Sequence, residues 1–145
     1  MTDDGVVEVS IHIAASPETV FPFFTDPSRY VQWMGSGATL EPVPGGTYRV
    51  LMRGGVAAAG EFLEVSPPHR LVFTWGWTHD PAVPPGTTRV VVTLRPEAGG
   101  TRVVLRHHGL PDDKQAGHHE QGWEFYLGRL LVLAQGGDPG PDPNT

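Results

Sequence analysis

The sequence predicts an α+β fold in which a curved antiparallel sheet of six or seven strands wraps around one long C-terminal helix. Three observations predict it: an alternating apolar segment near the N-terminus, five β-type segments joined by turns between residues 47 and 109, and one long amphipathic segment that ends near residue 134. An antiparallel sheet can bury one face and leave the other in water. Because the last segment is the only one long enough to cover that face, the sheet has to curl around it to complete a core.

The first element is predicted from a strict alternation of side chains in residues 6–15. Its apolar positions are Val7, Val9, Ile11 and Ile13. A period of two is typical of a strand with one buried face.

Two short helices are predicted after this strand. Ser16 is a good N-cap and Pro17 suits the first helical position. Pro22 cannot stand inside a regular helix, so we expect the first helix to be short or kinked. Asp26 followed by Pro27 repeats the start signal for the second helix.

The middle of the chain reads as an antiparallel meander, because its β-type segments follow one another with short connections. These segments are residues 47–53, 58–66, 71–77, 88–96 and 101–109. A short extended piece in the loop before residue 47 would bring the strands to seven. The Pro-rich residues 78–87 cannot pair in a sheet and are predicted to form a loop.

The long helix is predicted to begin at an N-cap, Asp112 or Asp113, and to run to about Ala134. Its apolar stripe consists of Trp123, Leu127, Leu130, Leu131 and Ala134.

The length of 145 residues suits one domain with its own core, and we expect that domain to occupy residues 6–135. Residues 136–145 are rich in Gly and Pro and are predicted to be a disordered tail.

Composition excludes several classes of function. The chain has no cysteine, which excludes disulfides, thiolate zinc sites and a cysteine nucleophile. Its net charge is -6 and its nine arginines are scattered along the sequence, so we expect no nucleic-acid partner. No apolar run approaches the roughly 18 residues that span a membrane, and the acidic start lacks the apolar core of a signal peptide. We therefore expect no membrane partner and a cytoplasmic location.

Five separated pieces of the sequence together resemble one protein family. They are SPETVFPFFTDPSRYVQW, PGGTYRV, GEFLEVSPPHRLVFTWGW, TRVVVTLRPEAGGTRVVLRHHGLP and HHEQGWEFYLGRL. The chain resembles the bacterial family of activator of heat-shock protein 90 ATPase homologs, in the START-like, helix-grip (SRPBCC, polyketide cyclase) superfamily. The resemblance runs from about residue 6 to residue 134. It implies a helix-grip fold with a cavity between the bent sheet and the gripped helix.

The resemblance implies little about activity, because the superfamily holds carriers, cyclases and co-chaperones alike. The eukaryotic co-chaperones that give the family its name carry an additional N-terminal domain that this sequence does not include. We therefore do not expect the family name to describe this protein's activity.

The leading hypothesis is binding of a small hydrophobic or aromatic molecule between the sheet and the long helix. The expected wall residues are Trp33, Met52, Trp75, Trp77, His107 and Trp123. Several indoles around one cavity would suit a flat or lipid-like ligand. The alternative is that they simply fill the core.

A rival hypothesis is a cyclase or dehydratase that acts on a polyketide-like substrate, with His107 and either Glu61 or Glu64 as its acid and base. The alternation of the strand allows two registers. If Leu63 faces the core, Glu61 does too; if Phe62 faces the core, Glu64 does too. A bulge in the segment AAAGE would keep both out, and this is the interpretation we favour. His107 itself faces the helix, either as a hydrogen-bonded core residue or as a polar group at the cavity mouth.

A metal site would need His118 and His119 together with His107. Neighbouring helical residues point about 100° apart and the spacing matches no zinc motif, so we predict no metal and no cofactor. Gly122 either allows close packing or leaves space for a ligand, and packing is the expected reason.

A third hypothesis is a chaperone-interacting protein, which would need a large exposed apolar patch. A homodimer and a monomer are both compatible with the sequence.

Overall fold

The computed structural model describes residues 6–145, and the first part of the acidic start discussed above, residues 1–5, lies outside them. One seven-stranded antiparallel sheet forms the body, with the strand order β1-β7-β6-β5-β4-β3-β2. The strands are β1 (Val7–Ile13), β2 (Gly37–Leu40), β3 (Thr47–Leu51), β4 (Ala57–Ser66), β5 (Arg70–Trp75), β6 (Thr88–Glu97) and β7 (Gly100–His108). Each consecutive pair from β2 to β7 is antiparallel, so the predicted meander is confirmed.

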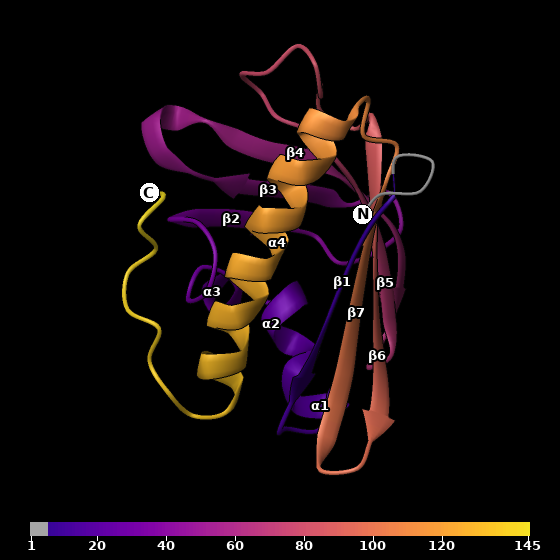
Figure 1. Cartoon of the computed structure of the whole chain (residues 1–145), viewed down its shortest axis with the longest axis vertical. Helices are drawn as coiled ribbons and strands as arrows, with labels where there is room; N and C mark the ends of the chain where they lie inside the picture. The colour runs from indigo at the N-terminus through magenta and orange to yellow at the C-terminus, as the bar shows by residue number, and fades with distance from the viewer. Residues whose placement is uncertain (1–5) are drawn as a thin grey trace.

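The long helix α4 (Asp113–Ala134) begins where the sequence predicts, since the side chain of Asp112 accepts a hydrogen bond from the backbone of Gln115. Figure 1 shows α4 lying across the bent sheet, with β2, β3 and β4 running across the direction of β1, β6 and β7. The predicted α+β, helix-grip architecture is therefore confirmed.

Proline divides the helical segment after β1. It forms α1 (Pro17–Val20), α2 (Pro22–Thr25) and α3 (Pro27–Tyr30), and each of the three helices starts with a proline. Proline removes a backbone donor, so a new helix begins at each one. The segment predicted as two short helices is thus three, with the break at Phe21.

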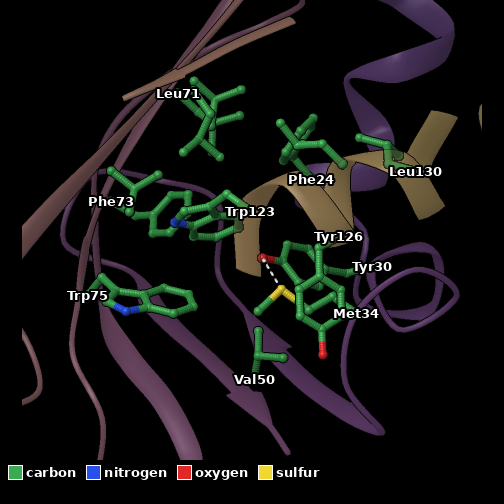
Figure 2. Packing of buried hydrophobic residues seen from close by; sticks show 14 of the residues in the cluster. Phe24, Tyr30, Met34, Val50, Leu71, Phe73, Trp75, Trp123, Tyr126 and Leu130 are labelled. Atoms are coloured by element: carbon green, nitrogen blue, oxygen red, sulfur yellow. Dashed lines mark hydrogen bonds between the residues drawn. The ribbon is translucent and has the colours of Figure 1, made fainter. Parts of the chain in front are cut away.

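The core lies between the sheet and the helices, and every strand contributes buried residues to it. The short edge strand β2 contributes Leu40, with Ala38 partly buried against the core. Figure 2 shows Trp123 of α4 beside Phe73 and Trp75 of β5, while Tyr30 and Met34 come from α3 and the turn after it. The rings of Trp75 and Trp123 lie with their centroids 5.0 Å apart, which fixes the helix on the sheet.

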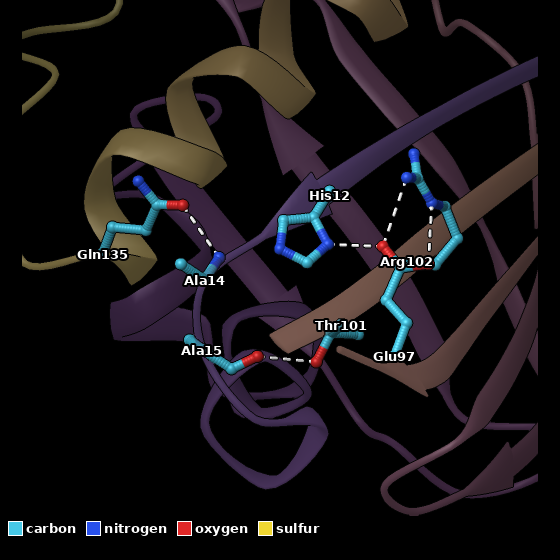
Figure 3. Close-up of polar contacts among 7 residues, drawn as sticks. All are labelled: His12, Ala14, Ala15, Glu97, Thr101, Arg102 and Gln135. Carbon is cyan, nitrogen blue, oxygen red and sulfur yellow. Dashed lines mark hydrogen bonds and ion pairs between the residues drawn. The ribbon is translucent and has the colours of Figure 1, made fainter. Parts of the chain in front are cut away.

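Polar contacts tie the end of β1 to the C-terminal end of α4 and to β6 and β7 (Figure 3). The side chain of Gln135 accepts from the backbone N–H of Ala14 at 2.8 Å, and the hydroxyl of Thr101 donates to the carbonyl of Ala15 at 2.7 Å. Glu97 pairs with both His12 and Arg102 at the β6–β7 turn.

The C-terminal segment differs from the expectation of a disordered tail. Asp142 is only 7% exposed, and its carboxylate accepts from the backbone of Gly35 at 2.8 Å and from the hydroxyl of Tyr126 at 3.0 Å. The buried guanidinium of Arg129 donates to the carbonyls of Pro139 and Gly140. A high content of Gly and Pro does not report this packing, because it depends on the partners of Asp142 and Arg129 in distant segments.

Among the helices of residues 6–145, none combines the length and the apolar composition needed to cross a membrane.

Candidate functional site

A pocket of about 400 Å³ lies between α4 and the end of β5 with the loop that follows it. Its lining residues are Met34, Trp75, Trp77, His79, Asp80, Lys114, Gln115, His118, His119, Gly122, Trp123 and Tyr126. Aromatic side chains and Met34 line the inner part, and the titratable side chains come from the loop and from the first turns of α4. An apolar interior with a few polar groups is typical of sites for small organic ligands.

Gly76 positions one wall of the pocket. A Cβ atom at Gly76 would lie 1.8 Å from the carbonyl oxygen of Pro84, so only glycine lets the loop fold back over the strand end. In the returning loop, the carbonyl of Val83 accepts a hydrogen bond from the backbone N–H of Trp77 at 2.7 Å. Trp77 is thereby held beside Trp75, with the two rings nearly perpendicular and their centroids 5.2 Å apart.

A buried chain of hydrogen bonds stands behind the aromatic wall. The indole N–H of Trp123 donates to Nδ1 of His107 at 3.0 Å, so the neutral imidazole carries its proton on Nε2. The Nε2–H of His107 donates to the hydroxyl of Thr88 at 2.8 Å, and this hydroxyl donates to the carbonyl of Trp75 at 2.8 Å. The chain joins α4 to β5, β6 and β7 and fixes two of the pocket's rings.

His119 makes a second link of the same kind. Its Nδ1 donates to the carbonyl of Gln115 at 2.7 Å, which leaves Nε2 to accept from the indole N–H of Trp77 at 3.0 Å. Both histidines are thus neutral donors and acceptors. Burial is the main cause that holds the pKa of His107 well below 6.5, and His119 lowers it further. Burial also lowers the pKa of His119, although its bond to Gln115 opposes the shift.

These lowered pKa values predict that the protein loses stability in mild acid. Below about pH 6.5 the unfolded chain protonates His107 and His119 while the folded chain does not, so the unfolded state binds more protons. Each group then lowers the free energy of unfolding by up to about 1.4 kcal/mol per pH unit. Urea unfolding between pH 7.5 and pH 5 measures the slope. A free energy of unfolding that does not fall over this range would contradict the assignment of both residues as neutral.

Two further features stand out around the pocket: open space at Gly122 and an indole nitrogen of Trp75 that is unpaired within the described residues. A Cβ atom at Gly122 would meet no atom within 4 Å, so this helical glycine faces open space. The expected reason for it, close packing, is therefore wrong. Among the buried side-chain N and O atoms of residues 6–145, the indole nitrogen of Trp75 is the one that lacks a hydrogen-bond partner. This nitrogen is itself inaccessible, so it is a buried donor of the core and not a group exposed in the pocket.

The predicted wall residues fall into two groups. Trp75, Trp77 and Trp123 line the pocket together. The other three lie elsewhere. Trp33 is fully buried in the core, where its N–H donates to the carbonyl of Phe23.

Met52 lines a neighbouring pocket of about 300 Å³ that shares Trp77 and Tyr126 with the first. His107 faces α4 as expected, but it is fully buried behind the rings and has two partners, Thr88 and Trp123.

The acid–base pair of the cyclase hypothesis does not form. A bulge between Phe62 and Glu64 turns Phe62 into the core and leaves Leu63 45% exposed. Glu61 is exposed, and Glu64 pairs with Arg70 on the outer face of the sheet. Both carboxylates are out of the core as we favoured: Glu61 because it alternates with the inward Phe62, and Glu64 because of the bulge. The bulge lies after the segment AAAGE and not in it.

Several residues that line the pocket are not among the wall residues predicted from the sequence. On α4, Gln115 and His119 lie at helical spacing before Trp123 and continue its stripe by two more turns, and this signal could have identified them. The loop residues His79 and Asp80 carry no such signal, because an irregular loop has no period from which to infer direction. The side chain of Gln115 donates to Asp80 at 3.4 Å, which ties the loop to the helix.

The chain is similar in sequence and structure to known proteins. Residues 14–135 match the family described as activator of Hsp90 ATPase homolog 1-like protein. The solution structure of an AHSA1-like protein from Rhizobium etli is 46% identical, with a TM-score of 0.77, covering 99% of this chain and 92% of that one. A crystal structure of a protein from Mesorhizobium loti is 26% identical, with a TM-score of 0.80, covering 88% of this chain and 95% of that one. A comparison with curated proteins finds no match.

A third structure comes from a biosynthetic gene cluster. DynU16, a protein in the dynemicin biosynthetic locus, is 26% identical, with a TM-score of 0.84. The match covers 97% of this chain and 51% of DynU16, so this chain spans about half of that protein. The matched family covers most of the sequence and the same fold recurs in each structure. The chain therefore belongs to the family of activator of Hsp90 ATPase homolog 1-like proteins, in the START-like, helix-grip superfamily.

Proposed function

We propose that this protein binds a small aromatic or hydrophobic molecule in the pocket between β5 and α4. The observation that carries the proposal is the pocket of about 400 Å³ bordered by Trp75, Trp77 and Trp123. Three indole rings offer large apolar surfaces at a low cost in side-chain entropy. The volume lies within the range of about 300–1,000 Å³ that is usual for such sites.

The polar groups of the pocket support a ligand with oxygen acceptors on an aromatic body. Lys114 and Gln115 stand at the helix end of the lining and can donate to such a group. Flavonoids and polyketide-like rings combine these properties, whereas a saturated fatty acid offers its oxygens only at one end.

The test combines a ligand screen with two glycine variants of α4. Intrinsic tryptophan fluorescence and thermal unfolding are measured with flavonoids, polyketide-like rings and fatty acids, and the best ligand is then titrated. Gly122→Leu places a side chain in the pocket, and we expect it to weaken binding at least about tenfold, since the ligand has to give up contact volume.

Gly128→Leu is the matched control, because Gly128 is in the same helix, has equally open space at its Cβ position and does not line the pocket. Both variants gain helix propensity of up to about 0.8 kcal/mol, so their folds are expected to hold. Equal affinities of the two variants would place the ligand elsewhere, and a screen without a thermal shift in any class would refute the binding proposal.

Catalysis is a separate proposal that similarity to a biosynthetic-locus protein supports only at the level of the fold. With Glu61 and Glu64 outside the pocket, any proton transfer would have to use the titratable groups of its lining, namely His79, Asp80, Lys114, His118, His119 or Tyr126. We assign no catalytic residue among them.

A further inference from the structure

The outer face of the sheet gathers arginines that are scattered in the sequence. Five of the nine arginines point away from α4, on three neighbouring strands: Arg70, Arg89, Arg95, Arg102 and Arg106. They alternate with the buried residues of β5, β6 and β7, so the period of two places them all on one face. A chain with a net charge of -6 thus carries a locally cationic surface.

The strand register builds a groove on this face. Ser10, Val104, Thr93 and Arg70 form one row across β1, β7, β6 and β5. Three of these side chains are small, whereas the next rows along the strands, about 7 Å away on either side, carry Arg106 and Arg95. A depression of about 310 Å³ results. The small side chains form its floor, and its borders carry Arg95, Arg106 and the carboxylate of Glu8.

Two of the bordering arginines are oriented by carboxylates that use only one of their nitrogens. Nε of Arg106 donates to Glu8 at 2.7 Å, and Nε of Arg70 donates to Glu64 at 3.1 Å. Within the part of the chain that the structure describes, their terminal Nη groups make no hydrogen bond, so each retains donors for a ligand.

The other groups in the groove are also available. Arg95 has no hydrogen-bond or ion-pair partner within residues 6–145, and it lies opposite Arg102 in the register. Arg102 differs from it, because Glu97 engages both Nε and Nη2 of Arg102 and that residue does not line the groove. The hydroxyls of Ser10 and Thr93 on the floor can donate to the same ligand.

We propose that this groove binds the phosphate groups of a small soluble molecule. Guanidinium groups match phosphate oxygens with paired N–H donors, and three of them converge here with two hydroxyls. Glu8 and Glu64 offset two of the three positive charges, so Arg95 supplies the excess charge. The preference for phosphate over a monocarboxylate rests on its larger number of acceptor oxygens, which the free Nη groups and the two hydroxyls can engage together. The site lies on the face of the sheet opposite to the aromatic pocket and does not depend on it.

The test measures pyrophosphate binding by calorimetry at constant ionic strength, with inorganic phosphate and acetate for comparison. We expect the order of affinity pyrophosphate, phosphate, acetate. Arg95→Gln removes the unpaired guanidinium, and we expect it to weaken pyrophosphate binding at least about tenfold. Arg95 is exposed and without a partner among the described residues, so the variant should retain the thermal stability of the parent protein.

Arg89→Gln is the matched control. Arg89 is on the same strand and the same face, is also exposed, and does not line the groove. We expect its affinity for pyrophosphate to change less than about twofold. Equal weakening in both variants would mean diffuse attraction to a cationic surface, and absence of binding at millimolar pyrophosphate would leave no site, so either result overturns the proposal.

Discussion

Replacing His107 with leucine is expected to lower the free energy of unfolding by about 3 kcal/mol, because a buried polar chain loses its central member. His107 is fully buried, accepts from the indole of Trp123 and donates to Thr88. Leucine has a similar volume, so little of the loss comes from a cavity. The indole N–H would be left without its acceptor in the core. For a domain of this size, the loss corresponds to a fall in Tm of roughly 6–12 °C.

His108→Leu provides the comparison, since His108 is the next residue and its side chain lies on the opposite face of β7. We expect this change to cost less than about 1 kcal/mol. Urea unfolding of both variants at pH 7.5 measures the difference. Similar losses would show that the hydrogen-bonded chain contributes nothing particular to stability.

Arg129→Leu is expected to have an effect of the same size, about 3 kcal/mol, because its guanidinium connects three parts of the chain. Nε donates to the carbonyl of Trp33 at 2.9 Å, while the two terminal nitrogens donate to Pro139 and Gly140. Leucine would leave the buried carbonyl of Trp33 and the partly buried carbonyls of Pro139 and Gly140 without these donors. The C-terminal segment would also lose one of its attachments to α4.

A double-mutant cycle separates these contributions. Deleting residues 136–145 removes the tail carbonyls, so Arg129→Leu in the shortened chain should cost only about 1 kcal/mol, through Trp33 alone. Additive losses in the cycle would mean that Arg129 acts independently of the tail. Hydrogen exchange at the backbone of Gly35, which donates to Asp142, reports release of the tail in the full-length variant.

The sequence was sufficient for the fold because its signals were local and repeated. Asp112 caps α4, and proline divides the first helical segment where Pro22 predicts. Alternation placed the inward residues of β7 correctly, including His107. These features depend on backbone geometry, which composition and period report directly.

The candidate site was only partly predictable, because its shape depends on contacts between distant segments. Trp33 and Trp77 are equally good candidates in the sequence, yet the first is buried against α2 and the second borders the pocket. The turn that presents Trp77 depends on how closely Pro84 approaches Gly76. No local pattern in the sequence reports such an approach, and the same holds for the register that brings Arg70 to Thr93.

Strand β6 serves two environments with alternate residues: Val90 and Val92 face the core, while Thr93 and Arg95 face water. Substitutions on the two sides therefore meet different neighbours, and only the shared backbone connects them. One surface of such a strand can diversify under selection while the other stays constant. A single curved sheet can in this way carry two recognition properties whose evolutionary histories are separate.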